Sequence, residues 1–286
     1  MIQYISPIQE RILLTLARHR FLTVSQLFDC GVGKPNRIRD ALALLRERKL
    51  TDKQRFGNIQ GVAYKGTVQD IHFLSNKGAN VLEEHGLLTA EEIKYPKSKN
   101  TFFRQDYFHR VATINSEISF ERWLLENNAS KLFCCNYSDK TGSQRNSTQT
   151  GTLKSVTRLT FESGSYIEPD IIFGYQRNEK NYLFCLEIYN GKDTKRVIEQ
   201  LVKLAEATKE SLVAQAFGYQ NANRVLCSFE YESNMKAVLE RITREPTFQK
   251  AGIEKFFFFN LHDKVKENFG KDWISIEGEF QNFTSF

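Results

Sequence analysis

Two acidic residues, Asp170 and Glu187, stand in apolar stretches of the sequence at a spacing that suits a metal site. Asp170 precedes an apolar run that includes Ile171 to Phe173, and Glu187 follows the apolar residues Leu183 to Leu186. Such runs are typical of strands with at least one buried face, and the polar segment 176–181 between them predicts a turn. Carboxylate oxygens on neighbouring strands suit Mg²⁺ or Mn²⁺. The pattern predicts metal-dependent phosphodiester chemistry.

The elements around these two strands predict an α/β domain. Apolar residues recur at helical spacing over 104–128, 193–209 and 233–244, and strand-like segments cover 131–137, 224–229 and 254–260. This order of helices and strands is typical of a mixed sheet with helices on its faces. Four consecutive phenylalanines, Phe256 to Phe259, predict a central or parallel strand that is apolar on both sides.

The first 90 residues predict a winged helix-turn-helix. Pro7 opens a first helix, Thr23 caps a short second helix, and Pro35 opens a third after a glycine-bearing turn at 30–33. The segment 50–74 is polar and hairpin-like, which predicts the wing. A closing helix follows, with Ser75 or Asn76 as its cap.

Basic residues gather on the third helix and the predicted wing. A helix that follows a short glycine turn is the one that lies in the DNA major groove, where its cations contact phosphates or guanine edges. These residues predict double-stranded DNA as a partner: Lys34, Arg37, Arg39, Arg46, Arg48, Lys53 and Arg55. The alternative is that this basic face supports a homodimer or is simply solvated.

The composition sets the limits of the interpretation. The chain has 286 residues and a formal charge of +6, which permits a polyanionic partner without requiring one. None of the five cysteines forms a CxxC pair, which favours reduced thiols in the cytoplasm over a disulfide framework. No leader or membrane-length apolar run is evident, so no membrane association is expected. The lysine-rich, apolar-poor stretch near residue 95 predicts a DNA-binding domain over 1–90, a linker over 91–102 and a second domain over 103–286.

The order helix, strand, hairpin, helix, strand, with a proline-aspartate on one strand and a glutamate on the next, resembles the PD-(D/E)xK restriction-endonuclease-like fold. Together with the predicted winged helix and the boundary Leu74-Ser-Asn-Lys-Gly-Ala, the chain looks like the plasmid replication-relaxation family, which includes MobC-type relaxases. The resemblance implies metal-dependent nicking of one strand at an origin of transfer or plasmid origin. It also implies accessory or coupling proteins as partners.

The resemblance assigns roles to further residues. The family pattern has a lysine two positions after the glutamate, whereas this chain has Tyr189, so Lys192 and Lys195 are the nearest substitutes. Glu117, on the helix before the strands, is a candidate third metal ligand, and His109 is a structural or phosphate-contacting candidate.

Tyr189 is itself a candidate nucleophile, because residues two apart on a strand project from the same face. Two functions therefore remain open from the sequence. The first is a site-specific, metal-dependent DNA-nicking enzyme. The second is a non-catalytic DNA-binding regulator of plasmid replication or transcription, in which the nuclease-like domain is degenerate.

Overall fold

The computed structural model describes residues 4–57, 67–96, 103–142, 151–220 and 222–283. The chain forms two compact units, Met1–Arg110 and Val111–Phe286. Among the described residues, no helix has both the length and the apolar character needed to cross a membrane.

The first unit combines helices with one antiparallel hairpin. Thr23 caps the second helix through the hydrogen bond from the Gln26 backbone N–H to its Oγ1 at 3.1 Å, and Ser75 caps the fourth through the Gly78 N–H at 3.0 Å, as the sequence predicted. Leu22 forms an isolated antiparallel bridge with His72 of this hairpin. Residues 58–66 of the predicted wing lie outside the described part of the chain. The elements are α1 (Pro7–His19), α2 (Val24–Asp29), α3 (Pro35–Glu47), β1 (Thr51–Gln54), β2 (Ile71–Leu74) and α4 (Asn76–Glu84).

The first unit extends beyond the boundary that the sequence predicted. The expected linker was 91–102, of which 97–102 lie outside the described residues, but the backbone N–H of Lys94 donates to the carbonyl of Ala17 at 2.8 Å. Phe103, in the 3₁₀ turn η1 (Phe103–Asp106), is fully buried against Phe21, and the Tyr107 hydroxyl donates to the Gln69 carbonyl at 3.0 Å. These aromatic side chains complete the core of the first unit, so the division falls at residue 110 rather than near 90.

The second unit contains a seven-stranded mixed sheet in the order β13-β12-β11-β10-β9-β8-β3. Strands β9, β10 and β11 are parallel, and the remaining neighbours pair in antiparallel fashion. Two small ribbons, β4 with β5 and β6 with β7, lie between β3 and β8 in the sequence. The strands are β3 (Ser130–Asn136), β4 (Lys140–Thr141), β5 (Lys154–Ser155), β6 (Leu159–Thr160), β7 (Tyr166–Ile167), β8 (Ile171–Arg177), β9 (Lys180–Tyr189), β10 (Asn223–Phe229), β11 (Phe257–Leu261), β12 (Trp273–Ser275) and β13 (Phe280–Gln281).

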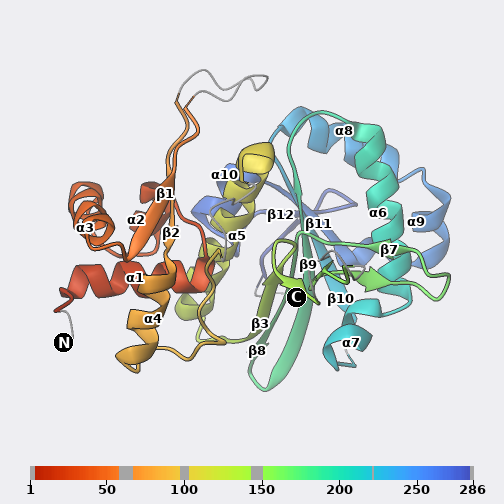
Figure 1. Cartoon of the computed structure of the whole chain (residues 1–286). Helices are drawn as coiled ribbons and strands as arrows, with labels where there is room; N and C mark the ends of the chain where they lie inside the picture. The colour runs from red at the N-terminus through yellow and green to blue at the C-terminus, as the bar shows by residue number, and fades with distance from the viewer. Residues whose placement is uncertain (1–3, 58–66, 97–102, 143–150, 221, 284–286) are drawn as a thin grey trace. The chain divides into compact units, whose positions relative to one another are not determined.

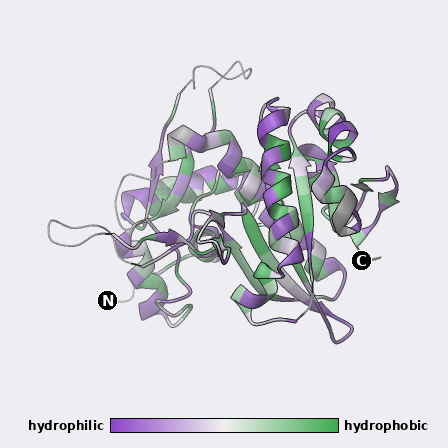
Figure 2. Cartoon of the chain, turned by 90° about the vertical axis from the view of Figure 1, so that its right-hand side faces the viewer, coloured by the Kyte–Doolittle hydropathy of each residue, from purple (hydrophilic) through white to green (hydrophobic). Residues whose placement is uncertain are grey.

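Helices cover both faces of this sheet (Figure 1). The sheet face here called the α6 face packs against α6 (Thr194–Lys209), α7 (Leu212–Phe217), α8 (Glu232–Ile242) and α9 (Pro246–Ala251). The opposite face, the α5 face, packs against α5 (Tyr107–Glu126) and α10 (His262–Glu267). Central strands of the sheet are coloured hydrophobic in Figure 2, whereas the helices alternate between hydrophobic and hydrophilic positions, which is the pattern of a buried sheet under amphipathic helices.

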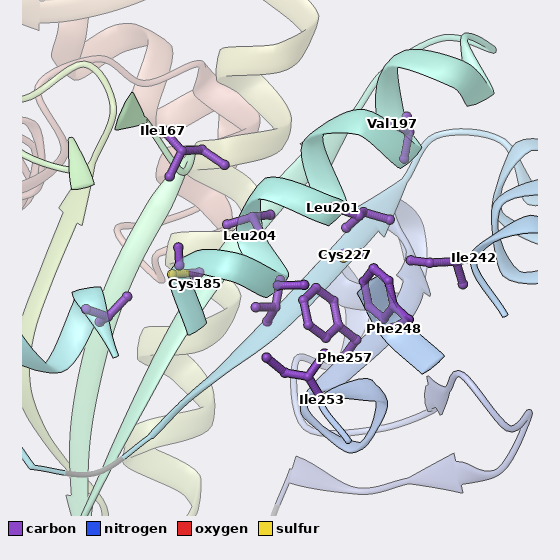
Figure 3. Close-up of a cluster of buried hydrophobic side chains, with 14 of the residues drawn as sticks. Ile167, Cys185, Val197, Leu201, Leu204, Cys227, Ile242, Phe248, Ile253 and Phe257 are labelled. Atoms are coloured by element: carbon purple, nitrogen blue, oxygen red, sulfur yellow. The ribbon is translucent and has the colours of Figure 1, made fainter. Parts of the chain in front are cut away.

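Each face of the sheet has its own apolar core. On the α6 face, Val197, Leu201 and Leu204 of α6 pack over Cys185 of β9 and Cys227 of β10 (Figure 3). The phenylalanine run behaves as expected for a strand buried on both sides. Phe257 and Phe259 belong to the α6-face core, and Phe258 belongs to the α5-face core.

The predicted α/β class with a large mixed sheet is confirmed, with local differences. The helix expected over 193–209 is α6, and Asp193 caps it through the Arg196 backbone N–H. The strand expected over 254–260 begins only at Phe257, because Glu254–Phe256 form the 3₁₀ turn η2. Asp170 lies one residue before β8, not within it.

Candidate acidic site

The hairpin β8–β9 places Asp170 opposite Glu187. The two strands are joined by Asn178 and Glu179, both at positive φ (49° and 63°), which is the geometry of a tight two-residue hairpin turn. The turn fixes the register, in which Ile171 pairs with Leu186. One further step along this register brings Asp170 and Glu187 face to face.

Both acidic side chains lie on the α6 face of the sheet. Cys185, two residues before Glu187, belongs to the α6-face core, and Ile172, two residues after Asp170, belongs to the same core. Asp170 is held from both sides. Its Oδ2 accepts from the Ile188 backbone N–H at 2.8 Å, and its carbonyl accepts from the Tyr137 N–H at 2.9 Å. The sequence prediction that two strands deliver these carboxylates to one place is therefore consistent with the geometry.

Glu187 is an acid in an environment that disfavours its charge. Its side chain is 1% exposed, and that of Asp170 is 8% exposed. Burial, and after it the negative charge of Asp170, raises the pKa of Glu187 well above its usual value. Glu187 Oε1 is buried without a hydrogen-bond partner among the described residues. An acid pair of this kind is costly to fold and is typical of functional sites.

Tyr189 shares the neighbourhood of the acid pair. Its ring packs against Phe229, with centroids 4.9 Å apart, and its hydroxyl is buried with no hydrogen-bond partner in the described part of the chain. Burial, and then the charge of Glu187, raises the pKa of Tyr189 well above its usual value. The phenol therefore keeps its proton, which disfavours it as a nucleophile.

The two candidate lysines contact groups other than the acid pair. Lys192 lies over the ring of Tyr231, 5.0 Å from the centroid. Lys195 is exposed, pairs with Glu199 at 3.9 Å, and lines an open groove together with Arg196 and Gln200.

Glu117 does not join the acid pair. It lies on α5, in the helical stripe that also carries Phe120 and Leu124, and these two residues pack on the α5 face of the sheet. Glu187 projects from the other face. Within the ranges that the structure describes, no group of three or more Asp, Glu, His or Cys side chains could hold a metal ion. The sequence predicted three carboxylate ligands, Asp170, Glu187 and Glu117, but in the structure only Asp170 and Glu187 lie together.

Two residues of α6 that the sequence analysis did not single out reach the acid pair. Gln200 Nε2 donates to Glu187 Oε2 at 2.5 Å. Arg196 lies one helical turn earlier, and its positive charge acts to lower the pKa of Glu187 against the larger effects of burial and Asp170. The sequence alone gives little indication that Arg196 and Gln200 belong to the site. They are polar residues bordering the apolar stripe of Val197 and Leu201, as on any amphipathic helix.

The predicted DNA-binding cations of the first unit divide into separate sets. Arg39 and Arg46 lie one above the other on α3 and line a groove of about 620 Å³ together with Lys53 and His72. Lys53 pairs with Asp70 at 2.6 Å, and the exposed Arg55 lies 3.7 Å from the same carboxylate.

The remaining cations lie elsewhere on this unit. Lys34 and Arg37 line a second groove of about 610 Å³ beside α1. Arg48 is half-buried, with its Nη1 3.4 Å from Gln9 Oε1 of α1, so this arginine is turned away from the exposed face of α3. His109 lies in the first turn of α5 and is half-buried.

The comparisons with known proteins assign no family to the chain. No protein-family model matches the chain, and no curated protein matches it. Among solved structures, a match is found to the structure of Lactococcus lactis ZitR, C30AH42A mutant. It has 16% sequence identity and a TM-score of 0.25, and it covers 43% of this chain and 73% of that chain. A likeness at this level carries no weight for the fold or the function.

Proposed function

We propose that this chain is a DNA-binding protein whose second unit cuts one DNA strand in a divalent-metal-dependent reaction. The observation that carries the proposal is the buried acid pair: Asp170, directly before β8, lies opposite Glu187 of β9. In detail, the proposal is a relaxase-type nickase of the plasmid replication-relaxation family. Its first unit is then a winged helix-turn-helix and its second a restriction-endonuclease-like domain.

The polar atoms at the pair fit a hard cation. Glu187 Oε1 and Tyr189 Oη are buried with no hydrogen-bond partner among the described residues, next to a second carboxylate. A hydrated Mg²⁺ or Mn²⁺ could satisfy both oxygens, with the Asp170 carboxylate as a further ligand. Such an ion would supply Lewis-acid stabilisation of the phosphate and a more acidic water.

The protein's own part in this reaction follows from its contacts. Asp170 and Glu187 would hold the cation, and the Ile188 N–H would keep the Asp170 carboxylate in place through its hydrogen bond. Water is favoured over Tyr189 as the attacking group, because the tyrosine is packed and protonated.

DNA binding is supported by the first unit. Helix α2, the turn after it, α3 and the β1–β2 hairpin follow one another in the order of a winged helix, with Arg39 and Arg46 exposed or half-exposed on α3. Double-stranded DNA at an origin of transfer or plasmid origin is the proposed ligand, with accessory or coupling proteins as further proposed partners.

A second candidate function, a non-catalytic DNA-binding regulator, is favoured by two observations. Gln200 already occupies Glu187 Oε2, and neither Lys192 nor Lys195 contacts the pair. A site satisfied by an internal hydrogen bond needs no cation to complete that oxygen.

The deciding experiment is nicking of supercoiled plasmid that carries the origin region, in Mg²⁺ or Mn²⁺, with the same plasmid lacking that region as reference. We expect Asp170→Asn and Glu187→Gln to slow nicking about 10²-fold or more, because each removes part of the charge stabilisation. Glu240→Gln, an exposed acid of α8 paired with Arg244, is the control and should nick at the wild-type rate.

Tyr189→Phe tests the nucleophile in the same assay. It should nick, because water attacks the phosphate, and no protein should remain covalently attached to the DNA. Wild-type protein that binds the origin DNA but nicks it with neither metal would instead establish the regulator.

A further inference from the structure

Helix α6 borders the acid pair and carries side chains that can supply a positive charge to a substrate phosphate. Arg196 and Gln200 are one turn apart on α6, so they lie on the same side of the helix. Gln200 contacts Glu187 directly, and both residues also line an open groove of about 1030 Å³. The groove and the buried acids therefore meet at these two side chains.

We propose that Arg196 binds the substrate phosphate above the acid pair, and that Gln200 is a positioning residue that fixes the Glu187 carboxylate beneath it. This inference rests on the proposed function, since it names the residue that receives the phosphate of the DNA strand to be cut.

A cationic side chain would assist this chemistry. Phosphoryl transfer spreads negative charge over the phosphate oxygens, which a guanidinium can stabilise. The position two residues after Glu187 offers a buried phenol and not a cation. Lys192 lies over the ring of Tyr231, and Lys195, which lines the same groove as Arg196, pairs with Glu199. Arg196 is exposed to the groove, and a guanidinium can donate two parallel hydrogen bonds to one phosphate.

The groove itself does not attract DNA by net charge. Cationic and anionic side chains lining it are equal in number, and Glu206 and Glu245 are among the anionic ones. A contribution from Arg196 should therefore be local to the phosphate being cut and should leave the overall DNA affinity, which the first unit supplies, nearly unchanged.

The test uses the full chain and single-turnover nicking at saturating DNA and Mg²⁺. Arg196→Ala should slow nicking about 10²-fold while the DNA dissociation constant stays within about twofold, and Arg196→Lys should recover part of the rate. The matched control is Arg244→Ala, because Arg244 is exposed, pairs with Glu240 and lies outside the groove. If Arg196→Ala nicks at the wild-type rate while Asp170→Asn does not, the inference is overturned and the proposed function stands.

A second measurement separates the inference from the nuclease proposal. Phenylglyoxal labelling of arginines, read by peptide mass spectrometry in EDTA, is compared with and without a double-stranded oligonucleotide from the origin region. Bound DNA should slow labelling of Arg196 about tenfold and leave Arg244 unchanged, because a phosphate covers the guanidinium. If the wild type never nicks, this protection still supports a phosphate site at Arg196. Equal labelling of Arg196 with and without DNA overturns it.

Discussion

Glu187 stands in the middle of a strand where an apolar residue would suit the fold better. Leu186 and Ile188 on either side of it are buried in the α5-face core, and Cys185 is buried in the α6-face core. A glutamate at this position is buried beside Asp170 and accepts a hydrogen bond from Gln200. Burying an acid beside an acid destabilises the folded state, so this residue pair is better explained by a ligand than by packing.

Replacing Glu187 by glutamine should therefore stabilise the metal-free protein at alkaline pH. The folded-state pKa of Glu187 lies above its unfolded value, so between the two values the folded protein binds more protons and loses stability as pH rises. Glutamine has no such loss. We expect Glu187→Gln to exceed wild type by about 1–3 kcal/mol at pH 8, and by less at pH 5.

Urea unfolding in EDTA, followed by tryptophan fluorescence, measures this difference, because Trp123 and Trp273 both belong to the second unit. Glu240→Gln is the surface control. A Glu187→Gln protein less stable than wild type at both pH values would mean that the hydrogen bond to Gln200 outweighs the cost of the buried charge.

At the scale of elements, the hairpin β1–β2 depends on a histidine that must stay neutral. His72 on β2 is buried, and its Nδ1 has no hydrogen-bond partner within the described residues. Burial, and after it the positive charge of Arg46, lowers the pKa of His72 from 6.5 to about 4. Protonation of this ring would place a charge between β2 and α3.

The stability of the hairpin should therefore fall in acid. Between pH 6.5 and pH 4 the unfolded chain binds a proton that the folded chain does not, so stability is complete above pH 6.5 and declines as pH falls through this window. The decrease in the free energy of unfolding should reach about 3 kcal/mol, which follows from the difference between the two pKa values. His72→Gln should make this acid-induced decrease smaller.

Amide hydrogen exchange of β1 and β2, read by mass spectrometry at pH 7 and pH 4.5 after correction for intrinsic exchange rates, measures this loss. The first unit contains no tryptophan, so fluorescence would not detect it. His85→Gln, at the end of α4, is the control. Equal acid destabilisation in wild type and His72→Gln would assign the effect to other groups.

At the scale of the whole molecule, the two units divide the proposed work, with recognition in the first and chemistry in the second. The formal charge of +6 permits a polyanionic partner without requiring one, so the placement of the cations carries more information. Arg39 and Arg46 line the groove that Lys53 and His72 also line, whereas Arg48 contacts Gln9 of α1.

This division predicts how DNA affinity of the full chain depends on salt. Arg39→Ala and Arg46→Ala should each reduce the slope of log K against log salt by about 0.9, the change for one lost phosphate contact. Arg48→Ala should leave the slope unchanged, although it removes the same charge. Titration of fluorescent origin DNA at several KCl concentrations gives the slopes, and equal slopes for all three variants would contradict this placement of the cations.

The sequence by itself determined those features that are local or periodic. Helical spacing and caps located α6 and α2, the apolar run located β11, and the polar turn between two apolar runs was enough to pair Asp170 with Glu187. These features depend on neighbours in the chain and on the alternation of a strand, so they are visible without coordinates.

Only the tertiary structure decided which side chains meet across the sheet. Glu117 and Arg196 both lie on amphipathic helices beside the acid-bearing strands, but α5 packs on one face of the sheet and α6 on the other. Periodicity says that a helix has a buried side and does not say which sheet face buries it. For that physical reason the sequence suggested Glu117, and the fold brought Gln200 of α6 to Glu187 instead. Lys195 also lies on α6, but its side chain pairs with Glu199.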